Sequence, residues 1–382
     1  FPFEENFAAL TAARRWPGST DRISQFRLAI EYERAGGWRT GQFPEPFQDW
    51  NDHFRDTTRS FWLHDASEIS KGRLGSDLRD LATRLSGSAD LFSHGEFPGG
   101  RGPLGSVNFV AAHDGFTLRD LVVYDHKHNL ANKEDNRDGN SNNRSWNHGF
   151  EGDVVEGING GPIEVLRRRS MRNLLATVLL SAGTPMLVAG DEMGRTQGGN
   201  NNVYCQDNEI SWVNWDLSEQ DNDLLEFTRT MMWLRRDHPV LRRRRFFTGD
   251  ARHGGESELG EIEWLTPAGE SMTDQDWTTW YARAMMVFLN GEAIAEPDER
   301  GQRIVDNSFL VLINASDEDI TFTLPGEGYA PTWKVALDTA PAVDGDSDPV
   351  LAADDTVVVE ARSMLFLIDA PDSDATTERH PR

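Results

Sequence analysis

Acidic residues follow two short apolar runs of this sequence, and their positions suit carbohydrate chemistry. Asp114 comes after the run 107–112, and Asp191 comes after the run 185–189. Hydrolysis of a glycosidic bond needs carboxylates on both sides of that bond: one protonates the leaving oxygen, and another attacks or stabilises the oxocarbenium-like carbon. His113, beside Asp114, offers ring nitrogens that can hydrogen-bond sugar hydroxyls. A His-Asp-Gly tripeptide also serves ordinary strand-end turns, so alone it leaves both interpretations open.

Alternating strands and helices are the elements that would position these side chains. Both apolar runs have the length and continuity of buried parallel strands. Apolar residues at helical spacing predict helices over 50–62, 66–85, 117–124, 163–180 and 221–237. Asp65 is the expected cap of the second helix. This alternation predicts an α/β fold with the C-terminal part of a (β/α)8 TIM barrel, whose active-site residues lie at the carboxyl ends of the strands.

The pattern changes after the arginine run 242–245. Runs rich in β-branched residues, separated by Asp, Gly and Pro, predict strands over 308–314, 320–324, 332–337 and 356–368. They indicate an all-β C-terminal sandwich. The predicted organisation is a divergent segment over 1–42, a part-barrel over 43–245, a β-sandwich over 246–370 and a flexible tail over 371–382.

Composition narrows the possible partners. The 382 residues carry a net charge of −25. Nucleic-acid binding depends on Lys and Arg neutralising phosphates, so the charge argues against it and is compatible with a neutral glucan. No run of about 18 apolar residues predicts a membrane span, and Phe1–Glu5 lacks the features of a signal peptide. The single cysteine, Cys205, excludes an internal disulfide and fits a cytoplasmic location.

Longer motifs favour the interpretation of Asp114 as a site residue rather than as part of an ordinary turn. The segment 108–120, NFVAAHDGFTLRD, closely resembles the seventh-strand motif of bacterial-type glycogen debranching enzymes, which are isoamylase-like members of the α-amylase superfamily (glycoside hydrolase family 13). Matching motifs occur at 50–56 (WNDHFRD), 126–129 (HKHN), 132 (N), 136–139 (NRDG), 147–149 (NHG), 183–186 (GTPM), 189–192 (AGDE), 199–202 (GNNN), 204–208 (YCQDN) and 235–240 (RRDHPV). The resemblance covers roughly 42–368 and corresponds to the C-terminal half of such an enzyme.

The resemblance implies an activity and roles for particular residues. Members of the family hydrolyse α-1,6 branch linkages of glycogen-like glucans with retention, without an organic cofactor or a metal. Asp114 matches the carboxylate that stabilises the transition state, and His113 matches a substrate-binding histidine. Asp191 matches no catalytic position, so we expect it to be structural, paired with arginine or backbone donors.

Two loops, 125–149 and 194–208, match family loops that line the glucan groove. Asn129, Asn132 and Asn201 are therefore candidate substrate-binding residues. The alternative is that the Asn and Gly residues there only form turns.

The two other carboxylates match poorly. Phe1-Pro2-Phe3-Glu4 stands where the family has Phe-Arg-Phe-Asp, which makes Glu4 the candidate nucleophile. Glu31, with Glu33 as the alternative, stands where the family places its acid/base, without the Pro-Trp-Asp that follows there. The alternative interpretation is that both are solvent-facing acids with no catalytic role.

Nothing in the sequence matches the family's N-terminal sandwich or its first three barrel strands, so we expect a truncated chain. The predicted function is hydrolysis of α-1,6 branches in glycogen or limit dextrin. The alternatives are a catalytically inactive glucan-binding remnant and another hydrolase of the superfamily, such as an isoamylase or a trehalose-pathway relative.

Overall fold

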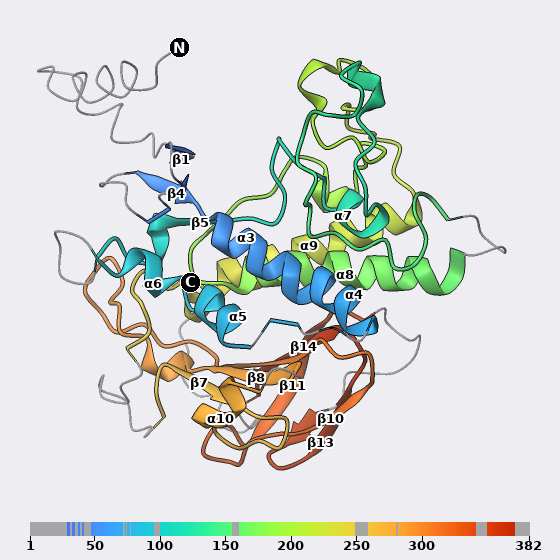
Figure 1. The fold of residues 1–382 in the computed structure, drawn as a ribbon. Helices are drawn as coiled ribbons and strands as arrows, with labels where there is room; N and C mark the ends of the chain where they lie inside the picture. The colour runs from blue at the N-terminus through green and yellow to red at the C-terminus, as the bar shows by residue number, and fades with distance from the viewer. Residues whose placement is uncertain are drawn as a thin grey trace, which may run out of the picture.

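The computed structural model describes residues 29–30, 33–34, 37–38, 40–41, 47–71, 73, 75–76, 78–94, 100–154, 160–248, 259–279, 282–340 and 350–370. A small parallel sheet, a group of helices and a larger antiparallel sheet make up this part of the chain (Figure 1). Among the described residues, no helix combines the length and the apolar character needed to cross a bilayer.

The parallel sheet contains four short strands in chain order. They are β1 (Ala29–Ile30), β4 (Gln48–Trp50), β5 (Ser106–Asn108) and β6 (Thr184–Pro185), and each pairs in parallel with the next. The strands expected over 107–112 and 185–189 are therefore present but shorter, because the chain leaves the ladder after Asn108 and Pro185. A parallel arrangement puts the residues that follow the strands at one edge of the sheet.

Helices connect these strands. They are α3 (Asp52–Arg59), a π-helical turn (Ser60–His64), α4 (Asp65–Ser70), α5 (Leu78–Leu85), α6 (Ala89–Phe92), α7 (Asp120–Val123), α8 (Gly160–Leu180), α9 (Glu219–Asp237) and, further on, α10 (Asp274–Trp277). The Asn51 side chain accepts from the amide of Phe54 and so caps α3. Ser218 and Asp221 form a capping box at the start of α9.

The expected continuous helix over 66–85, capped by Asp65, is wrong. Asp65 is itself a helical residue, the first of α4, which continues directly from the π-helical turn and ends at Ser70. The Asp65 carboxylate instead accepts from the amide of Ser76 at 2.9 Å and pairs with Arg283 at 3.3 Å. Its acceptors are therefore used by tertiary contacts rather than by a helix N-terminus.

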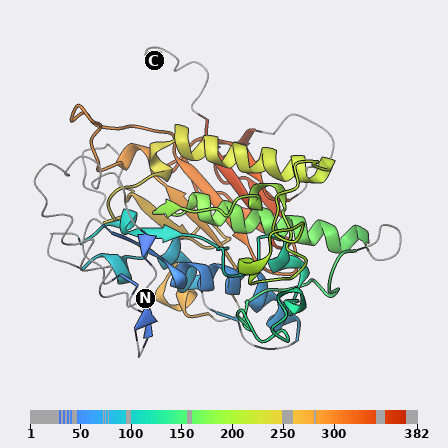
Figure 2. The same ribbon diagram turned by 90° about the horizontal axis from the view of Figure 1, so that it is seen from above.

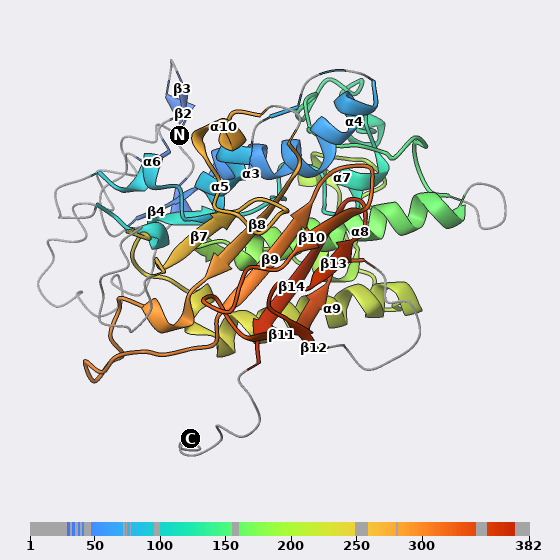
Figure 3. The same ribbon diagram turned by 90° about the horizontal axis from the view of Figure 1, so that it is seen from below.

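The antiparallel sheet has six strands in the order β12-β11-β14-β9-β8-β7 (Figure 3). Their bounds are Val350–Ala352, Thr332–Asp338, Ser363–Asp369, Phe309–Asn314, Ala284–Leu289 and Ile262–Leu265. A two-stranded sheet of β10 (Ile320–Thr323) and β13 (Thr356–Val359) packs on one face, and β2 (Glu33–Arg34) and β3 (Gly37–Trp38) form a separate hairpin. The strand expected over 356–368 is thus two strands, β13 and β14.

The two faces of the six-stranded sheet bury different cores. Along β9, Phe309 and Val311 join the core that includes α3 and α8, whereas Leu310 and Leu312 join the core that includes Phe322 of β10. The alternation follows from the two-residue period of a strand. Figure 2 shows α8 and α9 crossing the sheet on the first of these faces.

Buried charges also join the helices to this sheet. Arg283, next to β8, donates to the carbonyl of Phe61 at 2.7 Å as well as pairing with Asp65. Arg169 of α8 pairs with Glu360. The division into domains at 42/43, 245/246 and 370/371 stays a prediction.

Candidate functional site

His113 and Asp114 are exposed residues that follow β5 at the carboxyl edge of the parallel sheet. The ring of Trp50, the last residue of β4, meets His113 edge to face with centroids 5.7 Å apart. Trp50 also contacts Phe109 at 5.8 Å. The neighbouring strand thus supplies an aromatic side chain beside the predicted histidine and carboxylate.

A buried arginine from α3 lies close to this exposed pair. Arg59 donates from Nε to the carbonyl of Val110 at 2.7 Å and from Nη1 to the carbonyl of Asn143 at 3.1 Å. Burial lowers its pKa to about 9, while the charges of nearby carboxylates, Asp114 and Asp191 among them, oppose the shift. Arg59 therefore stays protonated at neutral pH and places a positive charge near Asp114.

Two buried carboxylates fix the segment that follows Asp114. The Asp191 carboxylate accepts from the amide of Leu118 at 3.0 Å, and Asp120 accepts from the Thr196 hydroxyl at 2.5 Å and the Gln197 amide at 2.9 Å. Burial raises the pKa of Asp120 to about 6 and that of Asp191 to about 7. The structural role predicted for Asp191 is confirmed. No separate sequence signal pointed to Asp120, although it lies within the recognised motif.

Asn129, Asn132 and Asn201 are buried where the two predicted groove loops meet. Asn129 Nδ2 donates to Asn201 Oδ1 at 2.9 Å, and the amide of Asn201 donates back to Asn129 Oδ1 at 3.0 Å. Asn132 Nδ2 donates to Asp138 at 2.8 Å. These hydrogen bonds join the loop 125–149 to the loop 194–208. Their contact with substrate stays a prediction.

Close packing at this junction requires glycine. Gly139 has a φ of +71°, and a Cβ there would lie 2.2 Å from Asn201 Oδ1. Any larger residue would displace Asn201 from its partners. This is the physical reason for Asn and Gly occurring together in the two loops.

Glu4 and Glu31 lie outside the described residues, as does the rest of 1–28. Glu31 comes directly after β1 in the sequence, and β1 is the edge strand beside β4. Their predicted roles stay predictions. Among the described residues, no three His, Cys, Asp or Glu side chains form a group suited to a metal ion.

Two family profiles match the chain. One, described as isoamylase, C-terminal, matches residues 261–369, which hold the six-stranded sheet. The other, described as the YcjX-like family, matches residues 1–45, most of which are not described by the structure.

Solved structures share the fold. Pullulanase type I from Bacillus subtilis, in complex with maltose, is similar with a TM-score of 0.54 and 19% identity, covering 85% of this chain and 36% of that one. Pullulanase from Bacillus acidopullulyticus is similar with a TM-score of 0.52 and 18% identity, covering 85% and 30%. The chain thus shares its fold with part of these proteins.

Sequence relatives are more specific. The glycogen operon protein GlgX homolog of Mycobacterium tuberculosis is 49% identical over 90% of this chain and 46% of its own length. The glycogen debranching enzyme of Erwinia tasmaniensis is 40% identical over 86% of this chain and 42% of its own length. These glycogen debranching proteins are homologues of the chain, as its motifs predict. It spans about half the length of the curated relatives it matches.

Proposed function

We propose that this chain supplies part of the active site of an α-1,6-glucosidase, which hydrolyses branch linkages in glycogen or limit dextrin with retention. The observation that carries the proposal is the exposed pair His113 and Asp114 at the carboxyl edge of a parallel sheet, beside Trp50 and near Arg59. The four parallel strands in chain order support the finer proposal that they belong to a (β/α)8 barrel.

The geometry gives each of these side chains a task. The carboxylate of Asp114 binds sugar hydroxyls and stabilises the positive charge that develops at the anomeric carbon. His113 hydrogen-bonds a hydroxyl of the same glucosyl unit. The face of Trp50 offers an apolar surface for the C–H groups of a sugar ring.

The retaining mechanism needs two further carboxylates about 5–5.5 Å apart. Glu31 is proposed as the acid/base and Glu4 as the nucleophile. The position of Glu31 directly after β1 supports its role, because it follows a strand of the same sheet that leads to Asp114. Asn129, Asn132 and Asn201 are proposed to act on the substrate through the loops they hold in place.

A branched α-glucan is the proposed substrate, and the cytoplasm is the proposed location. The proposed hydrolysis involves no nucleic acid, membrane, metal or organic cofactor. The test is release of reducing ends by the purified chain from phosphorylase limit dextrin, with unbranched amylose as the control substrate. We expect release from limit dextrin only. Binding of limit dextrin without release would favour the non-catalytic glucan-binding alternative.

A further inference from the structure

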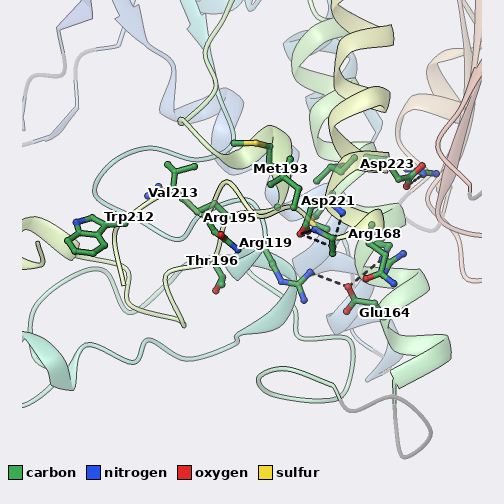
Figure 4. A pocket seen from close by; sticks show the side chains of 18 of the residues that line it. Arg119, Glu164, Arg168, Met193, Arg195, Thr196, Trp212, Val213, Asp221 and Asp223 are labelled. Carbon is green, nitrogen blue, oxygen red and sulfur yellow. Dashed lines mark hydrogen bonds and ion pairs between the residues drawn. The ribbon is translucent and has the colours of Figure 1, made fainter. Parts of the chain in front are cut away.

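A cavity of about 340 Å³ is lined by neither His113 nor Asp114. It lies between the N-terminal halves of α8 and α9 and is bordered by residues 193–196, 209, 212–214, 217 and 218 (Figure 4). This volume is within the range of small-ligand sites, about 300–1,000 Å³.

The arginines that line the cavity are all engaged within the protein. Their contacts are Arg119 with Glu164 at 3.1 Å, Arg168 with Glu164 at 3.5 Å, Arg172 with Asp223, and Arg195 with the carbonyl of Ser211 at 2.8 Å. Four acidic residues, Glu164, Glu209, Asp221 and Asp223, balance their charge. An anionic ligand would have to break these pairs, so the lining favours a neutral ligand.

Trp212 gives the cavity an exposed aromatic surface. Its side chain is 58% exposed, and its indole N–H donates to Asp207 at 3.0 Å, which fixes the orientation of the ring. In Figure 4 Trp212 lies at one end of the lining, next to Val213. A fixed, exposed ring can stack on the C–H face of a sugar.

Polar groups suited to hydroxyls lie beside this ring. Glu209 and Gln220 line the cavity and are exposed, and their side chains make no hydrogen bond to any other residue that the structure describes. A carboxylate and an amide together accept from and donate to sugar hydroxyls. An aromatic face with neutralised arginines and free polar side chains matches the chemistry of a linear α-glucan.

We infer that this cavity is a second glucan site, which binds a short unbranched α-1,4-glucan segment with one glucosyl ring on Trp212. The inference takes the α-glucan class from the proposed function. It requires no hydrolysis, because the cavity is separate from Asp114. The site would hold an outer chain of the substrate while another part of the same molecule lies at the parallel sheet.

The test is calorimetric titration of the purified chain with maltohexaose. Trp212→Ala should weaken binding about tenfold or more, through loss of the stacking surface. Trp215→Ala is the matched control, because Trp215 is 78% exposed on the same loop but does not line the cavity. It should keep the affinity. Glu209→Ala provides a second variant if Trp212→Ala fails to fold.

Either of two maltohexaose results would overturn the inference: no binding, or equal affinity in folded Trp212→Ala and in the unchanged chain. Inorganic phosphate is the comparison probe, and phosphate binding that competes with maltohexaose would also contradict a neutral-ligand site. Failure of hydrolysis with Trp212-dependent binding intact would refute only the proposed activity. Hydrolysis that depends on Asp114, with binding indifferent to Trp212, would refute only the second site.

Discussion

The carboxylate of Asp191 accepts a hydrogen bond from the backbone amide of Leu118, 3.0 Å away. This bond joins the segment after β6 to the segment after β5, four residues beyond Asp114. In the opposite direction, the carboxylate of Asp120, in the segment after β5, accepts from Thr196 and Gln197 in the segment after β6. The segment that follows the exposed Asp114 is therefore held in place by hydrogen bonds of both Asp191 and Asp120.

Ionisation of these two carboxylates should make stability depend on pH. Both pKa values are raised by burial, Asp120 to about 6 and Asp191 to about 7, above the usual value for aspartate. Between the ordinary pKa and these values the folded protein binds more protons than the unfolded chain. The stability that they contribute is therefore fully present at about pH 4 and lost as the pH rises through about 7.

Asp191→Asn tests this dependence, because it keeps an acceptor for the Leu118 amide and removes the titration. We expect a flatter profile of unfolding free energy between about pH 4 and pH 7, measured by urea denaturation. Asp216→Asn is the control, because it makes the same chemical change at an exposed aspartate. An unchanged slope in Asp191→Asn would contradict the prediction.

Asp114→Asn should abolish most hydrolysis while leaving stability unchanged. Asp114 is exposed, so its replacement leaves no buried group without a partner. Loss of the charge that stabilises the transition state should lower the rate about 10²–10³-fold. Reducing-end release from limit dextrin and thermal unfolding measure the two effects. Retained activity would show that the role assigned to Asp114 is wrong.

Asn201→Ala should destabilise the paired loops. Asn201 and Asn143 are buried, and Asn201 Nδ2 donates to Asn143 at 2.9 Å and to the carbonyl of Asn140 at 2.7 Å. Leaving these acceptors unsatisfied should cost about 1–3 kcal/mol. Asn222→Ala, at an exposed position of α9, is the control and should cost less than about 0.5 kcal/mol. Equal melting temperatures for the two variants would count against the loop-joining role.

Arg283→Met should destabilise the contact between the helices and the six-stranded sheet. The change leaves Asp65 buried with its charge uncompensated and removes a donor from the Phe61 carbonyl. Removing one partner of a buried pair costs about 3–5 kcal/mol. Arg229→Met breaks an exposed pair with Glu226 and should cost about 0–1 kcal/mol. Denaturant unfolding distinguishes the two, and similar losses would disprove the burial argument.

The spacing of apolar residues in the sequence predicted α8, α9 and most C-terminal strands. Each of these elements buries one face, or both faces of a strand, and such burial shows directly in the apolar pattern. The pattern failed at Asp65, whose carboxylate is used by Arg283 from 218 residues further along the chain. The motif around Asp114 located the exposed pair at the carboxyl edge of the parallel sheet. It could not reveal Arg59 or the cavity beside Trp212, since both arise from segments that meet only through tertiary packing.

The burial of the six-stranded sheet limits where this protein can be cut into soluble fragments. Every residue of β8 and β9 is buried, including Val287 and Val311 on the face that α8 covers. A fragment cut at the bounds of the isoamylase C-terminal profile would present that apolar face to water and invite association between copies. The smallest soluble piece containing this sheet must therefore carry α8 with it, so the unit defined by sequence comparison is smaller than the unit that can fold.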